Sequence, residues 1–322
     1  MTTLPFYTAV KDDFESVNQL IMDQLHSRIP LVEKIGNYII SAGGKRLRPL
    51  VVLLASRACG MHDPRQHLLA AIIEFLHTST LLHDDVVDTS DLRRGRSTAN
   101  ALWGNAPSVL VGDFLYSRSF QMMVDLGDMD IMRILAHATT VIAEGEVLQL
   151  TKVRDASTDE ATYMNVIRSK TAMLFEASSH SAAVLAGADA EQTEALRQYG
   201  NALGIAFQLI DDVLDYTGDA ATMGKNVGDD LAEGKPTLPL IYTMREGTAE
   251  QAQLVRQAIQ KGGLDDIGLI QHAVRECGAL DYTLQLARTE VDEAVRLLDC
   301  LPASEARDAL QQLARFAIDR TH

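Results

Sequence analysis

The sequence has few cysteines, a shortage of basic residues and no long uninterrupted run of apolar residues. Its three cysteines, Cys59, Cys277 and Cys300, are odd in number and form no CxxC or Cys/His spacing. This pattern excludes a disulfide framework and argues against a zinc site. Lysine and arginine total 29 against 44 aspartates and glutamates, giving a net charge of -15. Because phosphate backbones are bound by basic surfaces, nucleic acid is not an expected partner.

The N-terminal region has no basic stretch followed by an apolar run, and nowhere do about 18 uncharged apolar residues follow one another. We therefore expect neither export nor a membrane span, and the cytoplasm is the expected compartment. Hydrophobic residues make up 47% of the chain and charged residues 23%, which is typical of a globular protein and excludes disorder. No linker divides the sequence, so we expect residues 1–322 to form a single domain.

Apolar residues recur at three- and four-residue intervals along most of the chain, and no alternating run is bounded by hairpin signals. The sequence therefore predicts an all-α fold without strands. The expected helices cover residues 11–40 with a break at Pro30, then 50–58, 63–88, 108–126, 129–150, 158–185 with an interruption at Lys170 and Thr171, 191–216, 238–245, 249–260, 265–277, 280–299 and 303–320.

Two acidic clusters with the same spacing stand out from this helical background. They consist of Asp84, Asp85 and Asp88, and of Asp211, Asp212 and Asp215. Carboxylates at this helical spacing repel one another unless a cation lies between them. They suit Mg2+ held by one or two carboxylates per cluster, with water and a substrate phosphate completing the octahedron. A pair of solvated helix ends is the alternative, but the repetition of the cluster argues against it.

Basic residues accompany both clusters. They are Lys45 and Arg48 in a glycine-rich turn, Arg93 and Arg94 after the first cluster, Lys170 between the clusters, and Lys225 and Lys235 after the second. Cations beside metal-binding carboxylates in an otherwise acidic protein fit a diphosphate. Taken alone, the glycine-rich turn is more simply interpreted as a basic surface loop, although it is also a plausible anion-binding turn.

The segments HDDVVDTSDLRRG and QLIDDVLDYTGD, together with GGKRLRP and the pair KT, resemble the signature regions of the trans-polyprenyl diphosphate synthases. The similarity extends in motif order and spacing from about Gly43 to Pro239. It implies an isoprenoid-synthase fold, in which antiparallel helices surround a central cavity, and usually a homodimer. It also implies a stepwise, Mg2+-dependent condensation of isopentenyl diphosphate onto an allylic diphosphate such as farnesyl diphosphate.

The resemblance also assigns roles to individual residues. It implies about three Mg2+ ions, held by Asp84, Asp85, Asp88, Asp211 and Asp215 with Asp212 nearby. It implies an allylic diphosphate site formed by Arg93, Lys170, Thr171, Gln208, Lys225 and Lys235. It also implies an isopentenyl diphosphate site formed by Lys45, Arg48, His77 and Arg94. The six aspartates, Lys170 and Lys225 are the expected catalytic residues.

In this family, bulky residues four or five positions before the first cluster stop chain growth. Thr80 and Ser79 occupy these positions here, and because both are small a long product is expected. The stretches GDFLYSRSFQ and GEVLQL are most similar to bacterial octaprenyl and solanesyl synthases, which supply quinone side chains. The expected product is octaprenyl diphosphate, with solanesyl or medium-chain products as alternatives.

Three other readings remain open at the level of sequence. A terpene cyclase usually has a second metal motif that mixes Asn or Asp with Ser/Thr and Glu, whereas the second cluster here is fully acidic. A non-catalytic subunit of a heteromeric synthase would lose motif residues that this chain retains. A metal-binding helical scaffold would not need two separate sets of cations.

Overall fold

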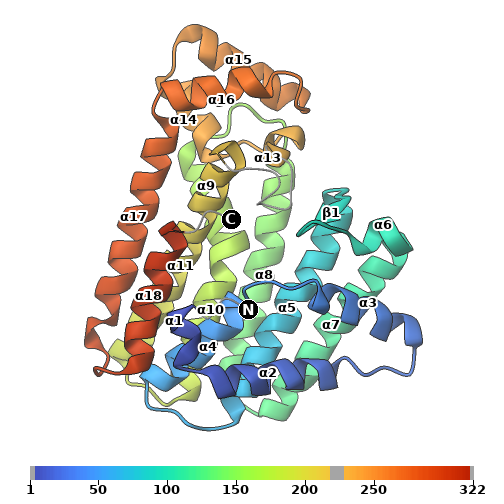
Figure 1. Cartoon of the computed structure of the whole chain (residues 1–322), viewed down its shortest axis with the longest axis vertical. Helices are drawn as coiled ribbons and strands as arrows, with labels where there is room; N and C mark the ends of the chain where they lie inside the picture. The colour runs from blue at the N-terminus through green and yellow to red at the C-terminus, as the bar shows by residue number, and fades with distance from the viewer. Residues whose placement is uncertain (1–3, 218–227, 320–322) are drawn as a thin grey trace. The chain divides into compact units, whose positions relative to one another are not determined.

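The computed structural model describes residues 4–217 and 228–319, whose backbone is almost entirely helical (Figure 1). The helices are α1 (Pro5–Thr8), α2 (Lys11–Gln24), α3 (Pro30–Ser41), α4 (Leu47–Ala58), α5 (Arg65–Val87), α6 (Ala99–Trp103), α7 (Asn105–Leu126), α8 (Met129–Lys152), α9 (Glu160–Ile167), α10 (Met173–Leu185), α11 (Ala190–Thr217), α13 (Asp229–Ala232), α14 (Leu238–Glu246), α15 (Ala249–Lys261), α16 (Ile267–Glu276), α17 (Ala279–Leu297) and α18 (Glu305–Asp319). No helix of the described chain is long and apolar enough to cross a membrane.

The contacts within the chain define two compact units. Unit 1 consists of Met1–His137, Leu174–Gly200 and Leu297–Leu313, and unit 2 of Ala138–Met173, Asn201–Arg296 and Ala314–His322. Neither unit is a continuous stretch of sequence, because the chain passes from one to the other several times. The expectation of one domain over residues 1–322 stays a prediction.

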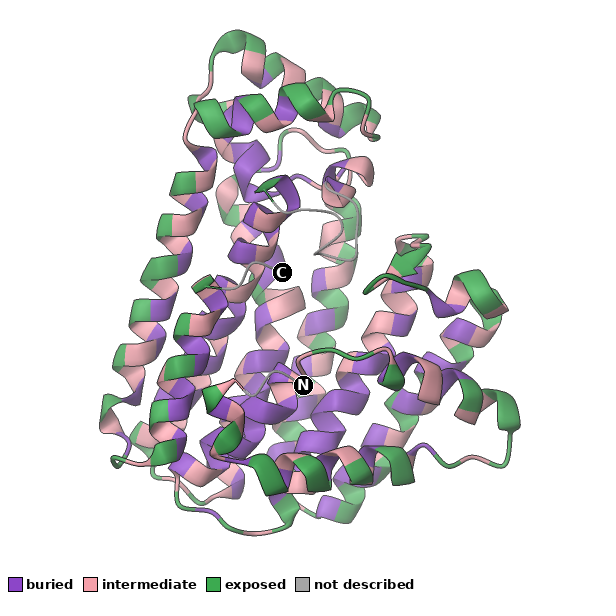
Figure 2. Ribbon diagram, viewed as in Figure 1, coloured by how far each residue is buried: buried purple, intermediate pink, exposed green. Residues whose placement is uncertain are grey.

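Unit 1 is built around α4 and α5, which are apolar on nearly every side. Leu50, Leu53 and Leu54 of α4 are completely buried, as are Leu69 and Ile72 of α5. In Figure 2 much of both helices is drawn in the purple of buried residues. A helix that is apolar all round must be covered by other helices. Accordingly, α5 packs against α2, α4 and α7. Each buried leucine or isoleucine contributes about 1.5–3 kcal/mol to folding, so this packing fixes the position of α5 firmly.

A close approach between α5 and α7 lies beside the first acidic cluster. A Cβ atom on Gly112 of α7 would collide with the imidazole of His83. The His83 Nε2 atom lies 3.2 Å from the carbonyl oxygen of Val109 and 3.3 Å from Asp113 Oδ1. The glycine therefore allows α7 to hold the residue that immediately precedes Asp84.

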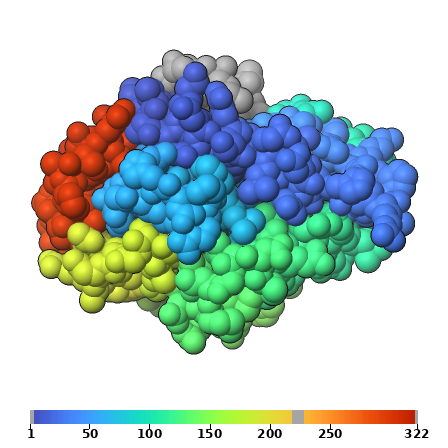
Figure 3. Space-filling model, turned by 90° about the horizontal axis from the view of Figure 1, so that it is seen from below, coloured from blue at the N-terminus to red at the C-terminus, as the bar shows by residue number. Residues whose placement is uncertain are grey.

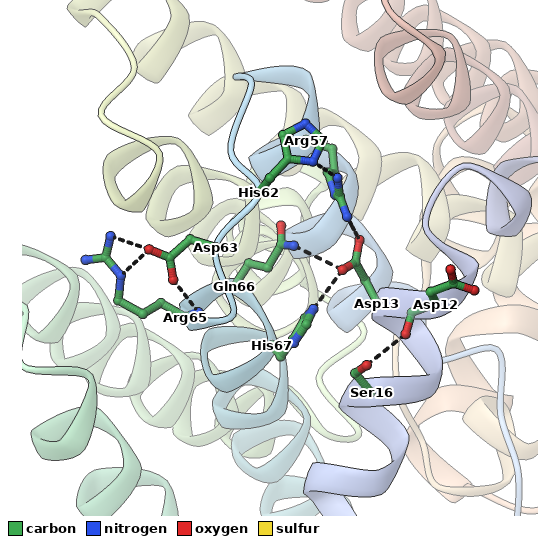
Figure 4. A network of polar contacts seen from close by, with 9 residues as sticks. All are labelled: Asp12, Asp13, Ser16, Arg57, His62, Asp63, Arg65, Gln66 and His67. Atoms are coloured by element: carbon green, nitrogen blue, oxygen red, sulfur yellow. Dashed lines mark hydrogen bonds and ion pairs between the residues drawn. The ribbon is translucent and has the colours of Figure 1, made fainter.

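Helix α2 is attached to α4 and α5 through one buried carboxylate, that of Asp13 (Figure 4). It accepts hydrogen bonds from Arg57 at 2.6 and 2.9 Å and from Gln66 at 3.2 Å, and His67 Nε2 lies 2.8 Å away. In Figure 3, the connection between α4 and α5 lies in light blue beside the dark blue N-terminal segments. Hydrogen bonds to a charged group of this kind are among the stronger ones, and they fix the N-terminal end of α5.

Unit 2 contains two apolar clusters that share helix α11. Leu209 and Ile210 belong to the first cluster, with residues of α9, α14 and α17. Tyr216 belongs to the second, with residues of α13 to α17. The second acidic cluster, at 211–215, therefore occupies the stretch of α11 between two anchored segments.

One expectation from the sequence is wrong: two short strands are present. β1 (Leu92–Arg93) pairs antiparallel with β2 (Arg96–Ser97). The turn between them, Arg94–Gly95, has φ values of 53° and 71°, as required by a tight hairpin turn of the primed type. Strands of two residues are too short to show apolar alternation, so the hairpin leaves no periodic signal in the sequence.

The helix expected over 158–185 is interrupted, as the sequence indicated. It consists of α9, a π-helical turn at Arg168–Ala172, and α10. The helix expected over 50–58 begins earlier, at Leu47.

Candidate active site

The first acidic cluster lies at the C-terminal end of α5. Asp84 and Asp85 are in its last turn, and Asp88 is the C-cap residue. Helix C-termini carry a partial negative charge, so cations are favoured there and carboxylates are not. The last turn of α5 contains no basic residue. The local electrostatics therefore favour a cation bound by this cluster.

Asp85 differs from Asp84 and Asp88 because it is completely buried, and it forms an ion pair with Arg93. Arg93 binds Asp85 Oδ1 through Nε at 2.8 Å and Nη2 at 2.7 Å. The other oxygen, Oδ2, is buried with no hydrogen-bond donor in the described part of the chain. The pair fixes the guanidinium of Arg93 beside the cluster, which explains how a residue of an exposed hairpin is held in place.

Two of the residues expected to bind isopentenyl diphosphate, Arg48 and His77, contact each other in unit 1. The Arg48 Nη1 atom donates to His77 Nε2 at 3.2 Å, and the Arg48 guanidinium lies 4.3 Å from the centre of the Phe175 ring. Burial, followed by the charges of Arg48, Arg94 and Arg93, lowers the pKa of His77 well below its ordinary value. His77 is therefore a neutral hydrogen-bond acceptor that orients Arg48. The positive charges at this expected site belong to Lys45, Arg48 and Arg94.

The glycine-rich turn brings Arg94 to this set. Gly44 has a φ of 129°, and a Cβ atom there would collide with the Arg94 guanidinium, which donates to the carbonyl oxygen of Gly43. The carbonyl oxygen of Lys45, in the same turn, accepts a hydrogen bond from the Tyr7 hydroxyl. The turn is thus held from both sides. Arg48 and Arg94 both lie near His77, and the role of the whole set in binding isopentenyl diphosphate stays a prediction.

The second acidic cluster lies at the C-terminal end of α11, whose last turn also lacks basic residues. Asp212 is buried and accepts hydrogen bonds from Tyr163 Oη at 2.5 Å and from Gln208 Nε2 at 2.8 Å. Thr171 Oγ1 in turn donates to Gln208 Oε1 at 2.9 Å. Burial, and next the charge of Asp230, raises the pKa of Asp212. The chain Thr171–Gln208–Asp212–Tyr163 thus joins two expected substrate-binding residues to the cluster.

Lys170 lies in the π-helical turn between α9 and α10. Its Nζ atom is 2.7 Å from Glu146 Oε2 and 2.8 Å from Gln149 Oε1, both on α8. The backbone of the turn is packed closely on Gly145, where a Cβ atom would lie 2.7 Å from Ser169 Cβ and 3.1 Å from the Lys170 nitrogen. Single π-helical turns often occur at functional sites, and this one fixes Lys170 against α8.

The resemblance assigns Lys170 to the allylic diphosphate, and replacing Gly145 by alanine is therefore expected to weaken that binding. The added methyl group would push the turn and Lys170 away from α8, and we expect the KM for farnesyl diphosphate to rise about tenfold, the equivalent of about 1.4 kcal/mol. Steady-state kinetics would measure this change. Gly268→Ala is the matched control, because a Cβ atom on Gly268 meets no atom within 4 Å. Equal KM values for the two variants would contradict the proposed role of the contact.

The loop after the second cluster contains two expected lysines. Lys225 lies outside the described residues. The backbone nitrogen of Lys235 donates to the carbonyl oxygen of Asp230 at 2.8 Å, and its Nζ atom is 2.5 Å from Glu233. At the start of this segment, the nitrogen of Gly228 donates to the carbonyl oxygen of Asp215 at 3.0 Å. Lys235 therefore belongs to a segment that is tied back to the aspartate helix.

Ser79 and Thr80, the residues expected to permit a long product, lie in the middle part of α5. Ser79 is 1% exposed and its hydroxyl has no hydrogen-bond partner among the described residues. Thr80 Oγ1 donates to the carbonyl oxygen of His77. Met122 and Met123 are buried on α7, the helix that packs against α5.

The donor atoms of the two clusters fit Mg2+ in their chemistry. Among residues 4–217 and 228–319, no three His, Cys, Asp or Glu side chains are arranged to hold a metal ion by themselves. Asp85 and Asp212 are instead engaged by Arg93 and Tyr163. The carboxylate oxygens at these two helix ends suit an ion that takes its remaining ligands from water and substrate phosphate.

The comparisons with known proteins agree with this arrangement. The family model described as polyprenyl synthetase matches residues 29–277. Octaprenyl diphosphate synthase of Escherichia coli is 52% identical over 309 residues, covering 96% of both chains. All-trans-nonaprenyl-diphosphate synthase of Rhodobacter capsulatus is 48% identical over 97% of this chain and 96% of that protein. A polyprenyl synthase of Caulobacter crescentus, solved with calcium and isoprenyl diphosphate, superimposes with a TM-score of 0.96 at 45% identity, covering 99% of this chain and 98% of the other.

The chain belongs to the polyprenyl synthetase family. It has the helical isoprenoid-synthase fold, and it is a prenyltransferase. The family and fold expected from the motifs are therefore confirmed, whereas the roles of individual residues stay predictions.

Proposed function

We propose that the protein is an octaprenyl diphosphate synthase, which adds isopentenyl diphosphate stepwise to an allylic diphosphate such as farnesyl diphosphate. The observation that carries this proposal is the 52% identity to an octaprenyl diphosphate synthase over 96% of both chains. The small, buried Ser79 behind the first acidic cluster supports a long product. The nonaprenyl relative, at 48% identity, makes a solanesyl product the second candidate. The expected use of the product is in a quinone side chain.

The acidic clusters and the basic residues near them have different roles in the proposed reaction. When bound, Mg2+ would be held by Asp84, Asp88 and Asp211, with Asp85 and Asp215 as further oxygen donors, and would stabilise the charge of the departing diphosphate. Arg93, Lys170 and Lys235 neutralise the rest of that charge, as does Lys225.

The remaining residues orient the second substrate and the reacting carbon. Lys45, Arg48 and Arg94 hold the diphosphate of isopentenyl diphosphate, with Arg48 oriented by His77. The oxygens of Thr171 and Gln208 lie beside the developing allylic cation, and their order is maintained by the hydrogen bonds to Asp212 and Tyr163. The released diphosphate accepts the proton that the new allylic unit loses, so no side-chain nucleophile takes part.

Members of the family generally use Mg2+. We propose about three ions per active site, because one or two carboxylates suffice for each Mg2+ ion and the two clusters together contain six aspartates. Titrating metal-free protein with Mg2+ in the presence of inorganic diphosphate, followed by calorimetry, would give the stoichiometry. A single ion bound would contradict this number.

One assay tests the proposed activity. Purified protein is incubated with Mg2+, farnesyl diphosphate and labelled isopentenyl diphosphate, and the dephosphorylated products are separated by chromatography. We expect octaprenol as the main product. The absence of incorporation would refute the synthase activity, whereas a product ending at geranylgeraniol would refute only the assigned chain length.

A homodimer is proposed from the outer face of α7. Leu110 is 65% exposed and Val124 is 67% exposed, and both lie on one stripe of this helix. Apolar side chains aligned in this way are typical of an interface between subunits. Sedimentation of Leu110→Glu and of the control Leu269→Glu, which changes an exposed leucine of α16, would test this. We expect only the first variant to lower the mass toward that of one chain.

The cytoplasm is the proposed compartment. The three cysteines are free and partly buried, as expected for a protein from a reducing environment. Cell fractionation with an antibody against the chain would test this assignment, and recovery with secreted proteins would contradict it.

A further inference from the structure

Helix α5 contains a buried carboxylate to which the proposed mechanism gives no role. Glu74 lies in the apolar stretch AAIIEFL and is 8% exposed. Its Oε1 atom is 3.9 Å from Arg46 Nε, and its Oε2 atom is buried with no hydrogen-bond donor among the described residues. A buried charge without close compensation is unfavourable, and its presence in a core helix therefore needs an explanation.

The compensation comes from the cations around the glycine-rich turn. Burial raises the pKa of Glu74, and the charges of Arg46, Arg48 and Arg94 act in the opposite direction, with Arg46 the largest of the three. Arg48 and Arg94 belong to the set proposed for isopentenyl diphosphate, whereas Arg46 points inward. The guanidinium of Arg46 donates to Asn18 Oδ1 and, at 3.3 Å, to the carbonyl oxygen of Ile40.

Arg46 occupies a special position in the backbone. It has a φ of 43°, in the left-handed region, and lies directly between Lys45 and the first residue of α4. Such a conformation is unfavourable for a residue with a side chain and persists only where surrounding contacts enforce it. Its guanidinium is held by Glu74, Asn18 and Ile40. The direction in which Lys45 and Arg48 leave the turn therefore depends on how Arg46 is held.

We propose that Glu74 is a positioning residue for the isopentenyl diphosphate site. It anchors Arg46, and it offsets the mutual repulsion of Arg46, Arg48 and Arg94 before a diphosphate is bound. Lys45, Arg48 and Arg94 are then already in position before the diphosphate binds. Binding therefore does not include the cost of bringing mutually repelling cations together. This inference rests on the proposed role of Lys45, Arg48 and Arg94.

The expected effect of Glu74→Gln follows from the loss of this charge. The glutamine has a similar shape but no longer offsets the arginines, and the turn loses its order. We expect the KM for isopentenyl diphosphate to rise about tenfold. The KM for farnesyl diphosphate and kcat should change less than about twofold, because other residues bind the allylic diphosphate and the metal ions. Glu74→Asp, which keeps the charge but shortens the reach, should raise the same KM by a smaller factor.

The control is Glu176→Gln, which removes another partly buried carboxylate of unit 1, ion-paired with Arg197 at 2.7 Å. Both variants are expected to lower Tm, and only Glu74→Gln is expected to raise the KM for isopentenyl diphosphate alone. Equal increases in both KM values, or an unchanged KM for isopentenyl diphosphate, would show that Glu74 has only a structural role. If Glu74→Gln does not fold, the same comparison is made with Glu74→Asp, and an unchanged KM there overturns the proposal.

Failure of this inference and failure of the proposed function give different results. If the wild-type protein incorporates no isopentenyl diphosphate, the proposed function fails. If it is active and the Glu74 variants retain the wild-type KM, only the role of Glu74 fails. Calorimetric titration of the wild type and Glu74→Gln with isopentenyl diphosphate, without the allylic substrate, gives the affinity independently of turnover.

Discussion

Replacing Asp84 or Asp211 by alanine is expected to lower kcat by about a thousandfold or more, the equivalent of at least about 4 kcal/mol in the transition state. Each substitution removes an oxygen donor from a helix end that contains no basic residue in its last turn. Stabilising the departing diphosphate is the main contribution of the protein, so the loss should appear in kcat rather than only in KM.

The measurement is the initial rate of labelled isopentenyl diphosphate incorporation at saturating substrates and several Mg2+ concentrations. Asp125→Ala, which removes an exposed aspartate from α7, is the control and should retain normal activity. Near-normal kcat in either active-site variant would refute its assignment as a metal ligand. A loss that is confined to Asp84→Ala would show that the second cluster has another function.

Replacing Ser79 by phenylalanine is expected to shorten the product without abolishing turnover. In the family, a bulky residue at this position stops the growing chain early, and Ser79 faces a buried environment in which its hydroxyl has no partner among the described residues. If no space for a chain existed there, the added ring would overpack the core, which typically costs about 1–3 kcal/mol.

Product analysis and thermal unfolding together distinguish these outcomes. Shorter prenols with a nearly unchanged Tm would support a path for the product beside Ser79. A lower Tm with an unchanged length distribution would show that Ser79 belongs to a filled core. Ser79→Ala is the control, since it keeps the small volume and should give the wild-type product.

Much of the local structure could be predicted from the sequence because it depends on short-range patterns. The period of the apolar residues indicates the helices, and the break at Pro30 separates α2 from α3 as expected. The spacing of the aspartates predicts that they share one helix face. The interruption at Lys170 was also visible, because a lysine and a threonine there break an apolar pattern.

Features that depend on residues far apart in the sequence could not be predicted. The π-helical turn at Lys170 is stabilised by its close approach to Gly145, and nothing in the local sequence specifies this contact. Spacing likewise could not show that Asp85 and Asp212 are buried and bonded to Arg93 and Tyr163. Asp215 is also buried, whereas Asp84, Asp88 and Asp211 are partly exposed, and this difference comes from tertiary packing.

Some residues of the site were missed although a signal was present. Glu74 is a single acidic residue within an apolar stretch, a pattern that indicates either a buried ion pair or a functional group. Tyr163 lies two turns before Lys170 on the same expected helix. Glu146 and Gln149, which bind Lys170, gave no signal of this kind, because polar residues on a helix are usually exposed.

The ion pair between Asp85 and Arg93 has a consequence for the design of inhibitors. An anionic compound that recruits Nε and Nη2 of Arg93 must first remove them from a buried carboxylate, and it would leave that carboxylate without compensation. Compounds that approach the Nη1 edge of Arg93 avoid this loss. Selectivity among phosphate mimics for this enzyme should therefore depend on the angle at which the anion meets the arginine more than on its total charge.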